Sequence, residues 1–228
     1  MIAPSATYDE VADWYEHDFL VTQRALGVDG FADRLGIDRS LAELLGAGTG
    51  TCLEIGCGTG IYADRIRQLG RTPIGVDVST GMLHHARSRL PTALSDATAL
   101  AVATASVPAV IAAMVHTDMA DYPTVLAEAF RVLTPGGIFV HVGVHPCFCG
   151  GFSDRSDLDA IIINSGYLDS AWTTDLWTDR GVRDKVGAVH YPLAELLSTM
   201  TATGFVLEEF AEGAEPTPVT LALRTRKP

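Results

Sequence analysis

The chain has 228 residues, 47% of them hydrophobic and 19% charged, which is typical of a single folded domain and excludes a disordered or coiled-coil protein. Its formal net charge of −12 has the wrong sign for neutralising phosphates, so we expect no nucleic acid partner. The first residues are acidic and no apolar run is long enough to span a membrane, so we expect no signal peptide and no membrane contact. The four cysteines lack the spacing of a disulfide framework, which favours reduced thiols and a cytoplasmic location.

Two nucleotide-binding motifs are missing from the chain. A phosphate-binding loop needs a Gly-Lys-Ser/Thr string and a short-chain dehydrogenase needs a Tyr-x-x-x-Lys pair. The chain has only two lysines, Lys185 and Lys227, and neither lies in such a string.

Apolar periodicity and turn residues predict alternating helices and strands. We expect two helices at 7–24 and 31–45, then strands at 51–55, 72–77, 92–96, 107–115 and 138–144. Helices are expected after the first two strands, and a third at 122–133 that ends before Pro135-Gly-Gly137. A closing helix at 192–203 and two strands at 205–210 and 219–224 complete the pattern.

This order predicts an α/β fold with a doubly wound, seven-stranded, mostly parallel sheet whose last strand is antiparallel. We divide this single domain into four segments: a helical lid at 1–46, a cofactor-binding core at 49–145, an acceptor-side insertion at 146–190, and a closing helix and hairpin at 191–228.

The loop Gly56-Cys-Gly-Thr-Gly60 follows the first strand of the predicted sheet, where doubly wound folds bind nucleotides. Glu54 stands two residues before Gly56, where a carboxylate disfavours a pyrophosphate and favours a ligand with an amine and a sulfonium. S-adenosylmethionine is such a ligand. Asp77 ends the second strand and can accept hydrogen bonds from both ribose hydroxyls, and Asp96 ends the third strand and can accept from the adenine amine.

Four motifs resemble those of the class I S-adenosylmethionine-dependent methyltransferases, in the branch that modifies small molecules such as quinones and natural products. They are Leu53-Glu-Ile-Gly-Cys-Gly-Thr-Gly60, Val76-Asp-Val-Ser79 with Met82, Ser95-Asp-Ala97, and Arg131-Val-Leu-Thr-Pro-Gly-Gly137. The resemblance covers residues 49–145 and, more loosely, the C-terminal segment. It implies the reversed last strand, S-adenosylmethionine as cofactor with S-adenosylhomocysteine as product, and methyl transfer. The cofactor residues that the motifs and this resemblance indicate are Glu54, Gly56, Cys57, Gly58, Gly60, Asp77, Val78, Met82, Asp96 and Ala97, with Tyr15 from the first helix, which closes over the cofactor in that family.

Three histidines are candidates for removing a proton from the acceptor. His116 and His145 follow the fourth and fifth strands, at the edge of the sheet where ligands bind, and His190 follows the insertion. An imidazole is suited to general-base catalysis at neutral pH. Pro146 directs the chain into the insertion, so we expect His145 to face the gap between donor and acceptor. No metal site is expected, because His145, Cys147 and Cys149 lack a distant fourth ligand.

These features predict an enzyme that transfers a methyl group from S-adenosylmethionine to a small-molecule acceptor. We expect it to be a monomer or a homodimer. Two alternatives remain open: a non-catalytic S-adenosylmethionine-binding subunit, and a nicotinamide-dependent oxidoreductase, which Glu54 and the missing Tyr-x-x-x-Lys pair disfavour.

Overall fold

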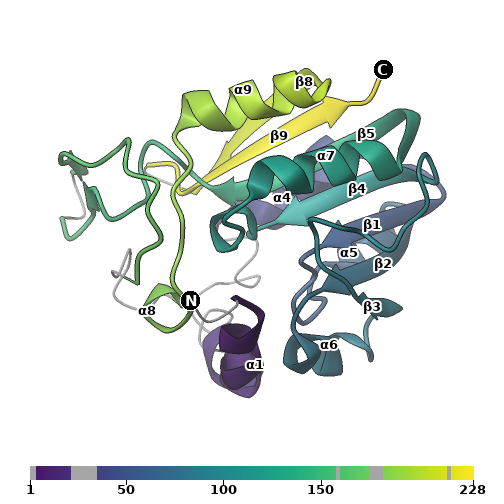
Figure 1. Ribbon diagram of the computed structural model, residues 1–228, viewed down its shortest axis with the longest axis horizontal. Coiled ribbons are helices and arrows are strands. Elements are labelled where there is room, and N and C mark those ends of the chain that lie inside the picture. The colour runs from purple at the N-terminus through teal and green to yellow at the C-terminus, as the bar shows by residue number, and fades with distance from the viewer. Residues whose placement is uncertain (1–3, 22–34, 158–159, 175–181, 215–216) are drawn as a thin grey trace.

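A seven-stranded sheet runs through the computed structural model, which describes residues 4–21, 35–157, 160–174, 182–214 and 217–228 (Figure 1). Its strands are β1 Thr51–Ile55, β2 Thr72–Asp77, β3 Thr92–Leu94, β4 Val107–Ala113, β5 Leu133–Val144, β8 Val206–Gly213 and β9 Thr220–Arg226. Strands β1 to β5 pair in parallel, and β9 is antiparallel to both β5 and β8. The predicted doubly wound sheet with a reversed last strand is confirmed.

The strand order, β3-β2-β1-β4-β5-β9-β8, puts β1 between β2 and β4. The chain therefore winds outward to β3 on one side of β1 and outward to β5 on the other. At such a switch point the loops that leave the carboxyl ends of neighbouring strands diverge, which opens a crevice for a ligand.

Helices cover both faces of the sheet, with α7 and α9 on one face and α4 and α5 on the other (Figure 1). The helical segments are α1 Pro4–Trp14, α4 Ile37–Ser40, α5 Ala63–Gln68, α6 Thr80–Ala86, α7 Tyr122–Val132, α8 Arg183–Val186, α9 Leu193–Thr203, the π-helical turns η1 Tyr15–Phe19 and η2 Leu41–Leu45, and the 3-10 turn η3 His116–Asp118. No helix in the described part of the chain has the length and apolar character needed to cross a membrane.

The core has two layers because side chains alternate along each strand. In β5, Phe139 packs into the layer that contains α7 and α9, whereas Val140 packs into the layer that contains η2 and α5. His141 lies on the same face as Phe139 and is buried there, with its Nδ1 atom 2.7 Å from the Tyr122 hydroxyl of α7.

Several predicted boundaries differ from the observed ones. Helix α7 ends at Val132 and β5 starts at Leu133, before the Pro-Gly-Gly string, because Leu133 is already extended. Strand β4 stops at Ala113, since Met114 adopts a left-handed φ of 60°. The insertion contains a small sheet, β6 Ser153–Asp154 and β7 Ile162–Ile163, which the sequence did not predict. Parts of the two expected N-terminal helices, 22–24 and 31–34, lie outside the described residues.

Helix α1 lies against α6 at the edge of the molecule (Figure 1). The Oδ1 atom of Asp9 accepts hydrogen bonds from the Ser79 hydroxyl, at 2.6 Å, and from the Gly81 amide, at 2.8 Å. Beyond α1, the Glu16 carboxylate of η1 accepts hydrogen bonds from the Arg89 guanidinium. The first helical segment is thus fixed to the part of the chain that follows β2.

Candidate active site

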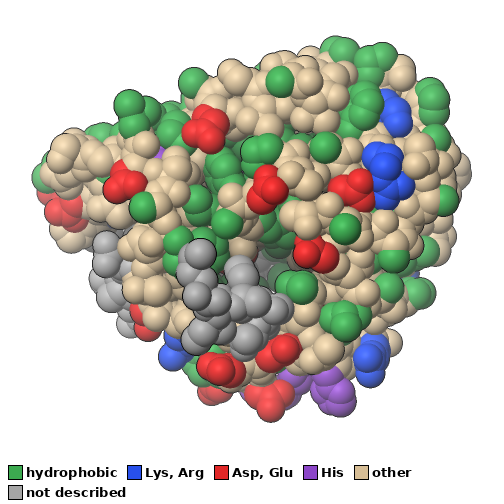
Figure 2. Space-filling model, viewed as in Figure 1, with side chains coloured by type: hydrophobic (Ala, Val, Ile, Leu, Met, Phe, Trp, Pro, Cys, Tyr) green, Lys and Arg blue, Asp and Glu red, His purple; other side chains and the backbone are tan. Residues whose placement is uncertain are grey.

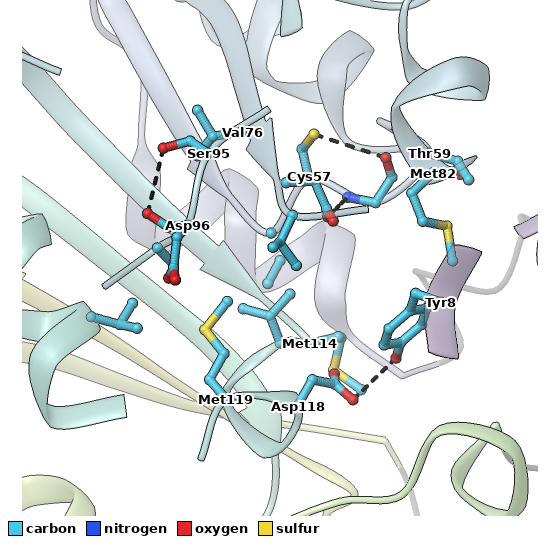
Figure 3. A pocket seen from close by; sticks show the side chains of 18 of the residues that line it. Tyr8, Cys57, Thr59, Val76, Met82, Ser95, Asp96, Met114, Asp118 and Met119 are labelled. Atoms are coloured by element: carbon cyan, nitrogen blue, oxygen red, sulfur yellow. Dashed lines mark hydrogen bonds between the residues drawn. The ribbon is translucent and has the colours of Figure 1, made fainter. Parts of the chain in front are cut away.

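A cavity of about 320 Å³ opens beyond the carboxyl ends of β1, β2 and β4, at the switch point of the sheet. Its size is at the lower end of the range for small-molecule sites. Nine of the eleven predicted cofactor residues line it: Tyr15, Gly56, Cys57, Gly58, Asp77, Val78, Met82, Asp96 and Ala97. In Figure 3, Cys57 lies on one side of the cavity, Ser95 and Asp96 on a second, and Tyr8 and Asp118 on a third.

The glycine loop forms one wall of the cavity. Gly58 has a φ of 52°, and a Cβ atom there would meet nothing within 4 Å, so this position needs glycine for its backbone conformation and not for space. Gly60 differs, because a Cβ atom there would lie 2.4 Å from the Leu90 side chain. Gly60 does not line the cavity. Its lack of a side chain lets the loop pack against the segment after α6.

Asp77 joins the glycine loop to the end of β2. Its Oδ2 atom accepts a hydrogen bond from the Gly58 amide at 2.8 Å, and its Oδ1 atom accepts one from the Ser79 amide at 2.9 Å. Burial raises the pKa of this carboxyl, while the two amide bonds oppose the shift. Each oxygen retains a second lone pair, so Asp77 can brace the loop and still accept hydrogen bonds from a ligand.

Asp96 lies on the opposite side of the cavity, in the loop that follows β3 (Figure 3). Its Oδ1 atom accepts hydrogen bonds from the Thr98 amide, at 2.8 Å, and from the Thr98 hydroxyl, at 2.7 Å. The side chain is exposed and held in one orientation by this local turn. Its Oδ2 atom accepts no hydrogen bond from the described residues, so it is available to a ligand.

Glu54 is buried beneath the glycine loop and does not line the cavity. Its Oε2 atom has no hydrogen-bond partner among the described residues. Burial, and secondly the negative charge of Asp77, raise the pKa of the Glu54 carboxyl to about 8. A buried carboxyl with an unsatisfied oxygen is costly, and a ligand with a positive charge at the loop would lower that cost.

Tyr8 and Asp118 line the cavity although neither was among the predicted cofactor residues. The Tyr8 hydroxyl of α1 donates a hydrogen bond to the Asp118 Oδ1 atom at 3.0 Å (Figure 3). The Arg183 guanidinium of α8 binds the same carboxylate. Burial raises the pKa of Tyr8, and burial raises the pKa of Tyr15 to about 12, with the negative charge of Asp118 as the second cause in both. Both tyrosines are therefore protonated at neutral pH.

The charged side chains of the cavity wall are all acidic among the described residues. The wall includes four carboxylates, those of Asp77, Asp96, Asp118 and Asp121, and no lysine, arginine or histidine. Asp118 is paired with Arg183, and Asp121 accepts hydrogen bonds from Thr124 at the start of α7. The remaining negative charge suits a cationic or neutral ligand and opposes a pyrophosphate.

The three candidate histidines do not lie where we expected them. His145 directly follows β5. Its Nε2 atom is 2.8 Å from the Glu212 Oε1 atom of β8, and its Nδ1 atom accepts a hydrogen bond from the Cys147 amide. In the sheet, β5 is followed by β9 and then by β8. The His145 imidazole faces β8 and lines a second hollow there, and it does not face the gap between donor and acceptor.

The two other histidines are also away from the cavity wall. His116 is buried with its ring centroid 4.8 Å from that of His141, and burial holds its pKa well below the usual range. His190 packs in the insertion against Phe152 and Tyr167. The structure thus brings the cofactor candidates together and leaves the three candidate bases outside the group.

Comparison with known proteins identifies the cavity-forming core. Residues 53–141 match the methyltransferase domain family model. A protein of Mycolicibacterium smegmatis named as a probable S-adenosylmethionine-dependent methyltransferase is 33% identical over 150 residues, which cover 63% of this chain and 57% of the relative. Residues 53–141 thus form the core of an S-adenosylmethionine-dependent methyltransferase domain.

The relatives of this methyltransferase domain extend beyond the matched region. The malonyl-acyl-carrier-protein O-methyltransferase of Serratia marcescens is 31% identical over 112 residues, which cover 46% of this chain and 44% of that protein. The matched regions thus span about half the length of these curated relatives. The family that the four motifs resemble is confirmed for residues 53–141, and with it S-adenosylmethionine as the cofactor of the domain.

Solved structures share the fold of the methyltransferase domain. An S-adenosylmethionine-dependent methyltransferase from Mesorhizobium loti superposes with a TM-score of 0.69 at 19% identity, covering 84% of this chain and 97% of that one. The cyclase SpnF superposes equally well, with a TM-score of 0.69 at 20% identity, covering 98% of this chain and 95% of that one. At these identities the likeness concerns the fold alone.

The sequence contained a signal for two of the overlooked wall residues, Tyr8 and Asp118. Tyr8 is an aromatic residue seven positions before Tyr15, so both share a helix face. Asp118 lies in the turn after β4, just as Asp77 ends β2 and Asp96 lies in the loop after β3. Carboxylates at successive strand ends meet at one edge of a parallel sheet, and this rule would have found Asp118.

Proposed function

We propose that this protein transfers the methyl group of S-adenosylmethionine to a nucleophilic atom of a small-molecule acceptor. The observation that carries the proposal is the cavity at the switch point of the sheet, whose wall joins glycine-loop amides, a braced Asp77 and a tyrosine pair. When bound, S-adenosylmethionine supplies an electrophilic methyl group, and methyl transfer leaves S-adenosylhomocysteine.

The residues of the cavity fit this cofactor. Asp77 has free lone pairs for two ribose hydroxyls, and Asp96 has a free carboxylate oxygen for the adenine amine. The unpartnered Glu54 oxygen supports a positively charged amine near the glycine loop. The carboxylates of the wall would stabilise the positive charge of the sulfonium before the reaction.

The protein would contribute alignment and exclusion of water. Tyr8 and Tyr15 come from the first helical segment and close one side of the cavity, so an acceptor there is shielded from solvent. Holding the nucleophile in line with the bond that breaks can supply a large part of the rate enhancement. The segments at 1–46 and 146–190 would thus act as the lid and the acceptor side of the domain.

The charges of the wall bear on the class of acceptor. An acceptor with a free carboxylate or phosphate at the reacting end would need a cation, and the described wall residues offer none. We therefore propose a neutral or basic acceptor. With the tyrosines protonated and Asp118 bound to Arg183, we further propose that its nucleophile reacts without an imidazole base.

Two experiments test this function. Calorimetry should show binding of S-adenosylmethionine and S-adenosylhomocysteine but not of NAD, and Asp77→Ala should weaken binding at least about tenfold, because charged hydrogen bonds contribute about 1.5 to 3 kcal/mol each. Asp64→Ala, which removes an exposed carboxylate on α5, is the matched control. Binding of NAD in place of S-adenosylmethionine would overturn the proposal.

The second experiment identifies the acceptor. The wild-type protein and Asp77→Ala are incubated with methyl-labelled S-adenosylmethionine and fractionated small-molecule extracts. We expect a labelled neutral or basic product with the wild type alone. Cofactor binding without any labelled product would instead support the non-catalytic S-adenosylmethionine-binding subunit.

A further inference from the structure

Three potential metal-binding side chains meet outside the cavity, where the first helical segment touches α6. The donor atoms of Asp13 in α1, His17 in η1 and His85 in α6 all lie within 4.8 Å of one another. The His85 Nε2 atom is 2.9 Å from the Asp13 Oδ1 atom, and the His17 and His85 rings pack edge to face with centroids 5.4 Å apart. Figure 2 shows histidine side chains gathered beside acidic ones at the edge of the molecule that α1 and α6 occupy in Figure 1.

This donor set has a recognisable coordination chemistry. Two imidazole nitrogens and one carboxylate oxygen suit zinc and its neighbours in the first transition series, and leave further positions for water. With metal–ligand bonds of about 2.1 Å, donors at the corners of a tetrahedron lie roughly 3.4 Å apart. The donor atoms lie within 4.8 Å of one another, and because Asp13 and His17 are exposed we expect their side chains to rotate into this geometry around an ion.

Contacts that do not involve these donors hold the two segments in place. Asp9 anchors α1 to the start of α6, and the Glu16 carboxylate binds Arg89 beyond the end of α6. The His85 side chain is only 13% exposed, and Leu83 and Ala86 pack α6 into the core. The three donors are thus brought together by the fold itself, which lowers the cost of ordering them around an ion.

We propose that Asp13, His17 and His85 form a binding site for one divalent transition-metal ion. Asp13 and His17 belong to the segment that supplies Tyr8 and Tyr15 to the cavity wall, and His85 belongs to the helix that supplies Met82. An ion bound at this site would join the lid segment to the core of the domain. The site itself lies outside the cavity wall, so its occupancy can be measured without any acceptor or cofactor.

The test uses the untagged full-length chain, freed of metal, with Zn²⁺ as the titrant in calorimetry and Co²⁺ as a spectroscopic probe. We expect one equivalent to bind, and the visible absorption of Co²⁺ to show nitrogen and oxygen ligands. His17→Gln and Asp13→Asn, both at exposed positions, should each weaken Zn²⁺ binding at least about tenfold, since even loss of a group that only orients a metal ligand costs 10- to 100-fold. His84→Gln, at the exposed histidine next to His85, is the matched control and should bind as the wild type does.

Metal should also raise the melting temperature of the wild type, because an ion that binds only the folded state stabilises it. The rise should be lost in His17→Gln and retained in His84→Gln, while both variants melt like the wild type without metal. No Zn²⁺ binding by the wild type, or binding that survives both substitutions, would overturn the proposal.

Discussion

Arg183 and Asp118 are separated by 65 positions in the chain and form an ion pair at the cavity, with side chains only 10% and 14% exposed. The Tyr8 hydroxyl donates to the same Asp118 carboxylate. Three separate parts of the chain therefore meet at one carboxylate: the first helix, the turn after β4 and the insertion.

Replacing one partner of this ion pair should destabilise the fold. We expect Arg183→Met to lower the free energy of unfolding by about 3 to 5 kcal/mol, because it leaves the Asp118 charge buried without its cation. Urea unfolding measures this loss. Arg67→Met, in the exposed pair with Asp64, should change stability by less than about 1 kcal/mol. Equal effects of the two substitutions would show that the Arg183 pair is not a buried one in solution.

The raised pKa of Glu54 predicts a pH-dependent affinity for S-adenosylhomocysteine. Below pH 8 the free protein holds a proton on Glu54, whereas a ligand ammonium group favours the ionised carboxylate. Affinity should therefore rise from pH 6 to pH 8, by up to about tenfold per unit, and level off above pH 8. Calorimetry in buffers with different heats of ionisation should show proton release at pH 7.

Glu54→Gln should remove this pH dependence, and Glu43→Gln, at an exposed position of η2, should retain it. A Glu54→Gln profile that matches the wild type would mean that another group releases the proton.

Acid should destabilise the protein through its buried histidines. Burial lowers the pKa of His141 to about 3 from its usual 6.5, so the unfolded chain takes up a proton between these values while the folded chain does not. Stability is thus fully present above about pH 6.5 and falls as the pH drops toward 3, with His141 alone contributing a loss of about 2 kcal/mol between pH 7.5 and pH 5. Urea unfolding at these two pH values measures it.

A matched pair of variants assigns this acid sensitivity to His141. His141→Phe should show a smaller loss of stability between the two pH values, whereas His84→Ala, at an exposed position, should show the full loss. The prediction fails if the His141→Phe and wild-type losses are the same.

Loss of the Asp9 hydrogen bonds that hold α1 on α6 should weaken ligand binding more than it destabilises the fold. Asp9→Ala removes hydrogen bonds that hold α1 on α6, so we expect affinity for S-adenosylhomocysteine to fall on the order of threefold to tenfold. Hydrogen exchange should become faster in residues 4–19, while the strands keep their protection. Glu10→Ala, at the exposed neighbouring position, should change neither quantity. Unchanged exchange in Asp9→Ala would show that other contacts hold the helix.

The sequence by itself determined the sheet and the part of the site that depends on local chain direction. Apolar runs, turn residues and alternation predicted the seven strands, and a glycine loop directly after β1 fixed the ligand end of the sheet. Asp77 and Asp96 could be placed because each follows a parallel strand, and such strands end at the same edge.

Only the tertiary structure decided which distant side chains meet. The Tyr8, Asp118 and Arg183 contact depends on where the first helix and the insertion return to the sheet, and no local pattern encodes that return. His145 directly follows β5, at the same edge of the sheet as Asp77, yet β9 and β8 lie beside β5, and the imidazole meets Glu212 on β8 and not the cavity. The partners of a side chain, and with them its pKa and its chemistry, follow from packing between segments far apart in the chain.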